Sequence, residues 1–257
     1  MKLFQEIAKF RYDVYCSERG YLNESDYEDG QETDHYDDRS VHIAAITFDG
    51  VGIGAVRLVL GSKTVEFPFE QHCSIDPDFE LPPRQQSAEI SRLIVKKNVR
   101  RFRGKPIPGT SNEARKRVGT ISLREHARKT AKVTQRIGSE LITLELLRAM
   151  YQYSIRNDIR YWYAAMEKGL DKLLGRMGFH LVPIGPEGDY YGPVTSYVGD
   201  LRKLEETLRQ SNESTLAWFQ DEAVSDWLLI STINNLNSGA HRSNRDGAAP
   251  PGFYEVV

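Results

Sequence analysis

The first twenty residues have the hydrophobic period of an amphipathic helix. Apolar side chains recur at spacings of three and four residues, at Leu3, Ile7, Phe10 and Val14. The same geometry places Arg11 and Tyr15 one turn apart on a neighbouring face. We expect this helix to end near Gly20, and residues 21–40, which have no apolar period, to form a loop.

Three strands are predicted between residues 41 and 95. Residues 41–48 and 51–60 flank an Asp49-Gly50 turn, which is typical of an antiparallel hairpin. After an irregular, proline-containing segment, residues 88–95 (AEISRLIV) have the β-branched content and the length of a strand.

Helices and strands alternate in the second half of the chain. The predicted elements are a helix at 139–157, a strand at 160–166, a helix at 167–177, short strands at 179–184 and 194–201, and two helices within 201–236. Ser139 is the expected N-cap of the first of these helices, and Gly178 is the expected stop of the next.

This order of elements predicts an α/β protein whose mixed sheet carries helices on both faces. We expect one domain over residues 1–200, interrupted at 98–138 by a basic insertion. Residues 201–236 are expected to add a helical extension. The tail, 237–257, is rich in Asn, Ser, Gly and Pro, as disordered segments are.

Composition narrows the class of protein. Apolar residues make up 40% and charged residues 27%, as in ordinary globular proteins. The two cysteines, Cys16 and Cys73, form no Cys-x-x-Cys pair, so we expect neither a disulfide framework nor a metal site. The chain has no run of about 18 apolar residues and its N-terminus lacks a signal-peptide core, so the expected location is the cytoplasm.

The charges are unevenly distributed although the net charge is only −2. Residues 1–40 hold eleven acidic side chains against five basic ones, whereas residues 96–136 hold fourteen basic side chains against two acidic ones. Such a positive segment attracts nucleic acid, an anionic membrane surface or a small acidic carrier protein. A solvated loop without a partner is the alternative interpretation.

Charged residues also occur inside two predicted strands. Arg57 shares a strand face with apolar neighbours, and Glu89 and Arg92 lie in a strand that should be central. A buried charge is costly unless it is paired, and burial raises the pKa of a carboxyl group. These residues predict either a cleft in which Glu89 accepts a proton or an interior ion-pair network. A regular strand would place Glu89 and Arg92 on opposite faces, so they converge only if a β-bulge intervenes.

Several short patterns together resemble a known signature. They are Arg11-x-x-Val14-Tyr15, Tyr21, Asp34-x-x-Asp37, Arg57 and Glu89-x-Ser91-Arg92. In this order and spacing they resemble the acyl-homoserine-lactone synthases. They resemble still more closely the N-acyl amino acid synthases and the acyltransferases associated with exosortase systems. The resemblance covers residues 1–100 well and residues 139–198 in layout.

The resemblance implies the fold of the general N-acetyltransferases (GNAT), a twisted mixed sheet splayed at a bulged central strand, with an acyl thioester in the gap. It implies that Glu89 helps to deprotonate the attacking amine while Arg57 and Arg92 orient the substrate. Substrate-binding positions carried over are Arg11, Tyr15, Tyr21, Asp34, Asp37 and Ser91. The backbone at Leu93 and Val95, freed by a bulge, is expected to stabilise the oxyanion. Tyr15 and Tyr21 stand where the lactone synthases favour Phe and Trp, which favours an amino acid over a lactone precursor as acceptor.

The donor is expected to be an acyl-carrier protein rather than coenzyme A. GNAT enzymes bind the coenzyme A pyrophosphate with backbone N–H groups that open a helix. In the corresponding segment, Pro106 and Pro108 have no N–H to donate. The cations that suit docking of an acidic carrier are Lys96, Lys97, Arg100, Arg101, Arg103 and Lys105. The acylated phosphopantetheine arm is thus expected as a co-substrate, and no cofactor is expected to be tightly bound.

Other functions stay open at this point. One is an N-acetyltransferase that uses acetyl-coenzyme A, and another is an acyl-binding or regulatory protein without turnover. A nucleic-acid-binding module is disfavoured because Phe102 is the single aromatic residue of the basic segment. We expect Trp218 and Trp227 to serve packing or a dimer face, with a wall of the acyl tunnel as the alternative.

Overall fold

A mixed β-sheet organises the protein, whose computed structural model describes residues 2–46, 52–96, 123–221 and 228–232. Its strands are β1 (Ser40–Ile46), β2 (Gly52–Leu60), β3 (Ser87–Val95), β4 (Tyr161–Met166), β5 (Val182–Pro183), β6 (Gly188–Asp189), β7 (Pro193–Asp200) and β8 (Leu228–Thr232). The strand order is β5-β7-β4-β3-β2-β1-β8, and β6 pairs with β7. β3 and β4 are parallel, whereas the other neighbours pair in antiparallel fashion.

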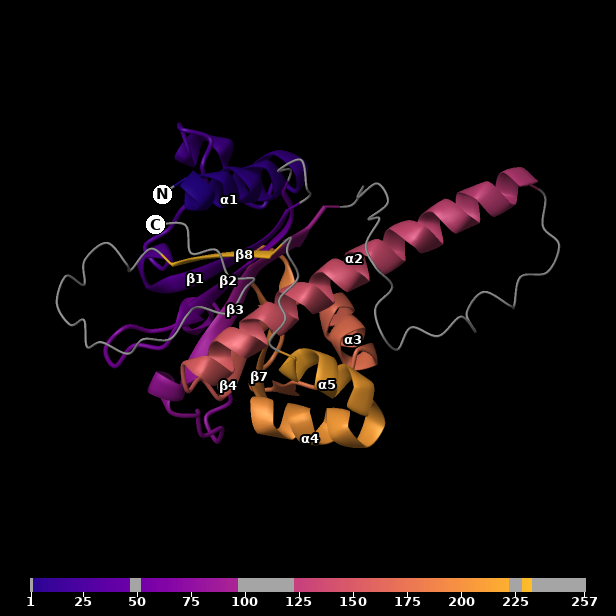
Figure 1. Ribbon diagram of the computed structural model, residues 1–257. Helices are drawn as coiled ribbons and strands as arrows, with labels where there is room; N and C mark the ends of the chain where they lie inside the picture. The colour runs from indigo at the N-terminus through magenta and orange to yellow at the C-terminus, as the bar shows by residue number, and fades with distance from the viewer. Residues whose placement is uncertain (1, 47–51, 97–122, 222–227, 233–257) are drawn as a thin grey trace, which may run out of the picture.

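Helices cover both faces of this sheet (Figure 1). They are α1 (Lys2–Tyr12), α2 (Leu123–Arg156), α3 (Lys168–Arg176), α4 (Leu201–Ser211) and α5 (Glu213–Gln220). α1 continues into a π-helical segment, Asp13–Glu18, and the chain then turns at Gly20, where φ is +63°. After α3 it turns at Gly178, where φ is +89°. Both glycines end their helices as predicted, because this backbone conformation favours glycine.

The two faces of the sheet have separate apolar cores. On one face, α2 packs against β1–β4 through Ile142, Leu146 and Leu147, and the same core includes Leu174 of α3 and Phe219 of α5. On the other face, Ile7 of α1 packs on Ala44, Ala55 and Ile94. A second cluster on that face joins Phe67 and Phe69, from the segment between β2 and β3, to Tyr163 of β4. The predicted α/β fold with helices on both faces is confirmed.

The central strand β3 carries a bulge. Arg57 of β2 lies opposite Ser91, and Ala55 lies opposite Ile94, so β3 advances by three residues where β2 advances by two. Arg92 takes up the extra residue with φ of +53°. This is the bulge that a convergence of Glu89 and Arg92 requires.

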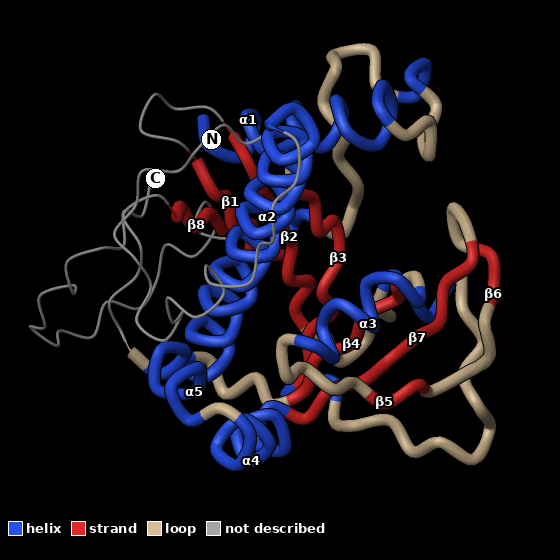
Figure 2. Tube along the Cα trace, turned by 90° about the vertical axis from the view of Figure 1, so that its right-hand side faces the viewer, coloured by secondary structure: helices blue, strands red, loops and turns tan. Residues whose placement is uncertain are grey.

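The sheet opens beside the bulge. β3 and β4 pair only through Ser87, Ala88 and Glu89, and their register stops at Glu89 opposite Tyr163. Beyond this point β4 and β7 turn away from β1–β3 (Figure 2). The splayed sheet that the family resemblance implies is thus present.

Two predicted boundaries are wrong. α2 begins at Leu123, so Ser139 lies within the helix rather than at its N-cap. The extension after residue 201 is helical only as far as Gln220, because Leu228–Thr232 form β8. β8 pairs with β1 along Val41–Ala45, and these ladder hydrogen bonds outweigh the helical spacing of its apolar residues.

Some predictions lie outside the described residues. They concern the Asp49-Gly50 turn, Trp227, the tail 237–257 and most of the basic segment. Among the described helices, none combines the length and the apolar composition needed to cross a membrane.

Candidate active site

A cavity of about 350 Å³ lies where β3 and β4 separate. This volume is within the range of small-molecule sites, roughly 300–1,000 Å³. Its lining includes β3 from Glu89 to Val95, Lys96 directly after it, β4 from Ala164 to Met166, and residues of α2, α3 and the segment after α1. Because it lies in the splay, the cavity joins the two faces of the sheet, and its two halves differ in chemistry.

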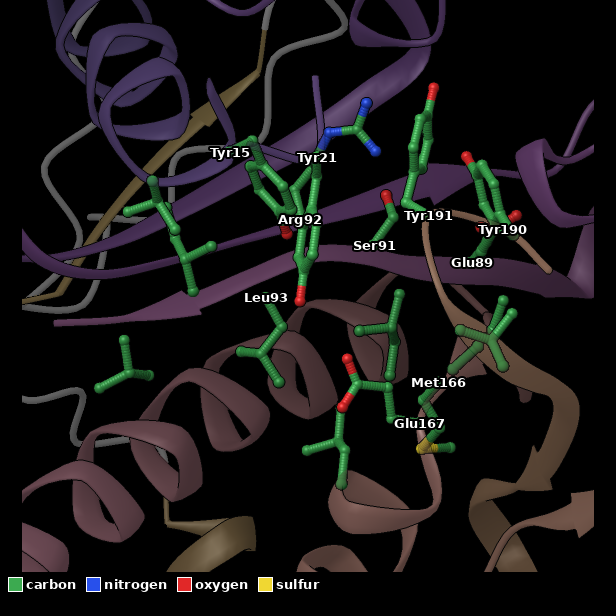
Figure 3. A pocket seen from close by; sticks show the side chains of 18 of the residues that line it. Tyr15, Tyr21, Glu89, Ser91, Arg92, Leu93, Met166, Glu167, Tyr190 and Tyr191 are labelled. Atoms are coloured by element: carbon green, nitrogen blue, oxygen red, sulfur yellow. The ribbon is translucent and has the colours of Figure 1, made fainter. Parts of the chain in front are cut away.

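The half that faces α2 and α3 is apolar apart from the exposed Glu167 beside Met166 (Figure 3), and we call it the apolar arm. Its side chains belong to the α2-side core or pack against it: Leu93, Leu147, Trp162, Ala164, Met166, Leu170, Leu174, Phe179 and Leu181. A hydrocarbon chain in this arm would be removed from water at a gain of about 0.8 kcal/mol per methylene. The arm therefore suits an acyl chain.

The other half is polar, and we call it the polar arm. It contains Tyr15, Tyr21, Ser91, Arg92, Tyr190 and Tyr191. Figure 3 shows Tyr15, Ser91, Arg92, Tyr190 and Tyr191 on one side of β3, whereas Leu93 and Met166 lie on the other. Tyr15 and Tyr21 lie with ring centroids 6.3 Å apart, and the Arg92 guanidinium is 5.3 Å from the centroid of Tyr15. The arm thus offers aromatic faces, hydroxyls and two guanidinium groups, those of Arg19 and Arg92, to a small polar molecule.

Glu89 lines the cavity at the point where the sheet begins to open. Its carboxylate accepts a hydrogen bond of 3.0 Å from the backbone N–H of Phe69, and Glu89 is only 2% exposed. Within the described residues no Lys or Arg forms an ion pair with it, since Arg57 and Arg92 bind other carboxylates. Burial raises the pKa of Glu89 to about 8, against the opposing effects of the Phe69 N–H and of Arg57 and Arg92. A carboxyl group with this pKa exchanges a proton near neutral pH.

Arg92 reaches the face of Glu89 and Ser91 because of the bulge. Its Nη2 lies 2.9 Å from Glu32 Oε1 and 3.2 Å from Asp34 Oδ2. Burial opposes the charged form, but Glu32 raises the pKa of Arg92 well above its ordinary value. The side chain is therefore a fixed cation at the cavity wall.

Behind Arg92 lies a buried ion network. Arg11 of α1 hydrogen-bonds Glu32 through Nε and binds Asp37 through Nη1 at 2.8 Å. Arg57 of β2 binds Asp34 at 2.6 Å and Asp37 at 2.8 Å, and its Nε donates to Ser91 Oγ at 2.9 Å. The network joins α1, β2, the bulge and the loop that contains Glu32, Asp34 and Asp37, which we call the acidic loop, into one unit.

Each carboxylate of the network is held ionised. Burial alone would raise the pKa of Glu32, but Arg92 and Arg11 lower it to about 2. The pKa of Asp34 and of Asp37 is lowered in the same way, by Arg57 and by Arg11 respectively. His42, 3.7 Å from Asp37, has a pKa lowered by burial to about 4, so it is neutral at physiological pH.

These contacts divide the predicted site residues into two groups. Those that line the cavity are Tyr15, Tyr21, Glu89, Ser91, Arg92, Leu93, Val95 and Lys96. Those that do not are Arg11, Asp34, Asp37 and Arg57, which form the network behind the wall. The expectation that Arg57 lines the cleft is wrong, because its guanidinium turns toward Asp34 and Asp37. Arg11 is 1% exposed and paired with Glu32 and Asp37, so it anchors α1 to the network.

The predicted carrier-docking cations are described only at Lys96, which is exposed at the cavity edge. Lys97, Arg100, Arg101, Arg103 and Lys105 lie outside the described residues.

Sequence reasoning missed three residues. Glu32 is fully buried between Arg11 and Arg92, and Tyr190 and Tyr191 line the polar arm. The position of Glu32, two residues before Asp34, was the available signal, but an acidic loop gives no indication of which carboxylate is buried. Tyr191 has φ of +57°. The sequence Tyr190-Tyr191-Gly192 does not predict this conformation, which is uncommon for a tyrosine.

Two backbone N–H groups of β3 point toward the cavity. Beyond the bulge, Lys96 donates its N–H to Ile53 of β2, and Ile94 lies opposite Ala55, so Ile94 and Lys96 face β2. Alternation along the strand then directs the N–H groups of Leu93 and Val95 to the opposite side, where β4 has separated. The role of these two N–H groups as donors to an oxyanion stays a prediction.

Comparison with known proteins agrees with this geometry. Residues 10–106 match the family described as an acetyltransferase (GNAT) domain. The protein has the GNAT fold. No curated protein matches its sequence.

Similar solved structures are acyl-homoserine lactone synthases, which bears out the predicted resemblance. A CoA-dependent synthase, BjaI, solved with MTA, is 18% identical with a TM-score of 0.55 over 87% of this chain and 84% of that one. TofI, in a ternary complex with an inhibitor and MTA, is 17% identical with a TM-score of 0.55 over 84% and 90%. The synthase LasI is 21% identical with a TM-score of 0.51 over 78% and 83%. The narrower resemblance to exosortase-associated acyltransferases stays a prediction.

Proposed function

We propose that the protein is an N-acyltransferase that transfers a long-chain acyl group from a thioester to the amine of an amino acid or a related small molecule. The observation that carries this proposal is the position of Glu89. Its proton-accepting carboxylate lies where the polar arm meets the apolar arm, beside the bulge of a GNAT sheet.

The chemistry is a single displacement. The amine nitrogen forms a bond to the thioester carbonyl carbon, the C–S bond breaks, and an amide and a thiol result. An amine is mostly protonated at neutral pH and attacks only after losing a proton. Glu89 accepts this first proton, directly or through water, and releases it to solvent. The nitrogen loses a second proton as the amide forms, and that proton neutralises the departing thiolate. The N–H groups of Leu93 and Val95 stabilise the tetrahedral oxyanion.

Each arm of the cavity binds a different substrate. The apolar arm holds the acyl chain, and the polar arm holds the acceptor. Arg92 supplies a cation that can bind the carboxylate of an amino acid, and the tyrosine faces enclose the rest of the molecule. The main alternative acceptor is a lactone precursor, because similar structures are acyl-homoserine lactone synthases.

The proposed donor is an acyl-carrier protein. The basic composition of residues 96–136 and the two prolines at 106 and 108 support it. Acyl-coenzyme A is the second candidate, and a specific observation favours it: BjaI is described as CoA-dependent and was solved with SAM and isopentyl-CoA. Transfer from a carrier protein should slow steeply as salt rises, whereas transfer from acyl-coenzyme A should depend on salt much less.

Mass spectrometry of lipid extracts tests the proposal and identifies both substrates. Cells that overproduce the wild-type chain should accumulate an acylated amine that is absent from cells producing Glu89→Gln. Glu187→Gln, which changes an exposed carboxylate paired with Lys168, is the matched control and should retain the product. Equal accumulation with Glu89→Gln would rule out the proposed role of Glu89, and no new acylated amine in any cells would contradict the proposed activity.

A further inference from the structure

We infer that Phe179 is the end wall of the apolar arm, that it limits the length of the bound acyl chain, and that Phe219 of α5 holds it in place. This inference rests on the proposed function in one respect, namely that the ligand of the apolar arm is an acyl chain. It gives the C-terminal helices a part in selecting the substrate.

The direction of β4 defines which end of the apolar arm is deep. β4 begins at Tyr161, where it is still paired with β3, and runs to Met166, where the sheet is open. Trp162 therefore lines the deep end and Met166 the open end. The Trp162 indole N–H donates to Ser154 Oγ of α2 at 2.9 Å, which fixes this wall of the deep end.

Phe179 separates the cavity from the C-terminal helices. It lines the cavity, it is 2% exposed, and its ring centroid is 5.2 Å from that of Phe219. Phe219 does not line the cavity but packs on Tyr151 of α2 at 5.7 Å. A chain that grew past Phe179 would therefore meet a second aromatic layer rather than solvent.

The layer behind Phe179 is fixed to α2. Gln152 Nε2 donates to the backbone carbonyl of Phe219 at 3.3 Å, and the Arg148 guanidinium lies 4.7 Å from the centroid of Trp218. Both views show α5 against the C-terminal part of α2 (Figures 1 and 2). These contacts hold the backbone of α5 against α2, and the rings of Tyr151, Phe179 and Trp218 around Phe219 restrict its side chain. The end wall is thus rigid, as a length limit requires.

A binding experiment tests the inference separately from turnover. Unreactive acyl-pantetheine thioethers of increasing chain length are titrated into the full-length protein by calorimetry. The longest chain that the wild type binds well defines its limit. In Phe179→Leu, affinity for the next longer thioether should rise about tenfold relative to the wild type, whereas Phe179→Trp should lower affinity for the chain at the limit by a similar factor.

Two further variants complete the test. Phe219→Leu leaves the cavity lining intact but loosens the layer behind it, so it should shift the limit in the same direction as Phe179→Leu. Phe67→Leu makes the same chemical change at a buried position on the opposite face and should leave the limit unchanged. An unchanged limit in folded Phe179→Leu and Phe179→Trp would overturn the inference. If no thioether binds the wild type at all, the acyl ligand of the proposed function fails instead.

Discussion

The guanidinium of Arg92 and the carboxylate of Glu32 lie 2.9 Å apart, although the two residues are 60 positions apart in the chain. Arg92 occupies the bulge of β3 in a left-handed backbone conformation, and Glu32 belongs to the acidic loop after α1. A non-glycine residue in this conformation costs about 1–2 kcal/mol. The ion pair offsets that cost and ties the N-terminal segment to the edge of the cavity.

Loss of the Glu32 charge should therefore destabilise the whole fold. Glu32→Gln leaves Arg11 and Arg92 buried with one counter-charge fewer, which should lower the free energy of unfolding by about 3–5 kcal/mol. Urea unfolding measures this change. Glu24→Gln, at an exposed position on the same loop, is the control and should change stability by less than about 0.5 kcal/mol.

The acid dependence of the same variant has a definite sign. The pKa of Glu32 is lowered to about 2 in the folded state, so its contribution is complete above its ordinary value of 4.5 and disappears as pH falls toward 2. The difference between wild type and Glu32→Gln should shrink over this window. A difference that stayed constant down to about pH 2 would contradict the ion-pair explanation.

The bulge itself can be tested at Arg92. Arg92→Ala and Arg92→Gly both remove the ion pairs, but only glycine adopts φ of +53° without steric strain. Arg92→Gly should therefore be more stable than Arg92→Ala by about 1 kcal/mol, the reverse of the usual order in a strand. Equal stability of the two variants in urea unfolding would mean that the bulge does not persist without the arginine.

Glu89 should make the protein less stable in mild alkali. Its pKa is raised to about 8, so the folded state holds a proton that the unfolded chain releases near pH 4.5. Stability from this group is full below 4.5 and declines as pH rises to about 8. Glu89→Gln lacks this decline and should be more stable than the wild type above pH 8, by on the order of 3 kcal/mol. Thermal unfolding across this range checks the prediction, with Glu187→Gln as the control variant that should follow the wild type. A wild type whose stability above pH 8 equalled that of Glu89→Gln would argue against a buried neutral carboxyl.

Much of the sheet was predictable from local signals. The hairpin of β1 and β2 follows from two strand-like segments on either side of Asp49-Gly50. The helical segment that begins with α1 and the helix α3 are each followed by a glycine with positive φ, Gly20 and Gly178. β8 was not predictable, because its pairing with β1 depends on a contact with a segment nearly 190 residues earlier in the chain. α2 was placed too late because its first turns carry the basic residues of an apparent insertion.

The site was predictable in its chemistry but not in its pairing. Buried charges at Arg57, Glu89 and Arg92 indicated either a cleft or an ion network, and both are present. Arg57 belongs to the network and Glu89 to the cavity, a division that depends on the bulge and on the path of the acidic loop. Sequence spacing predicts neither the bulge nor the path of the loop. For the same reason it did not predict that Glu32 is buried.

The most direct test of the account is the pH dependence of thiol release from an acyl thioester in the presence of the acceptor, for the wild type and Glu89→Gln. The wild-type rate should rise through an ionisation near pH 8, and Glu89→Gln should be slower by about 10²–10⁴-fold with that ionisation missing. A folded Glu89→Gln variant that kept the wild-type rate and pH profile would show that the carboxylate in the gap is not the base.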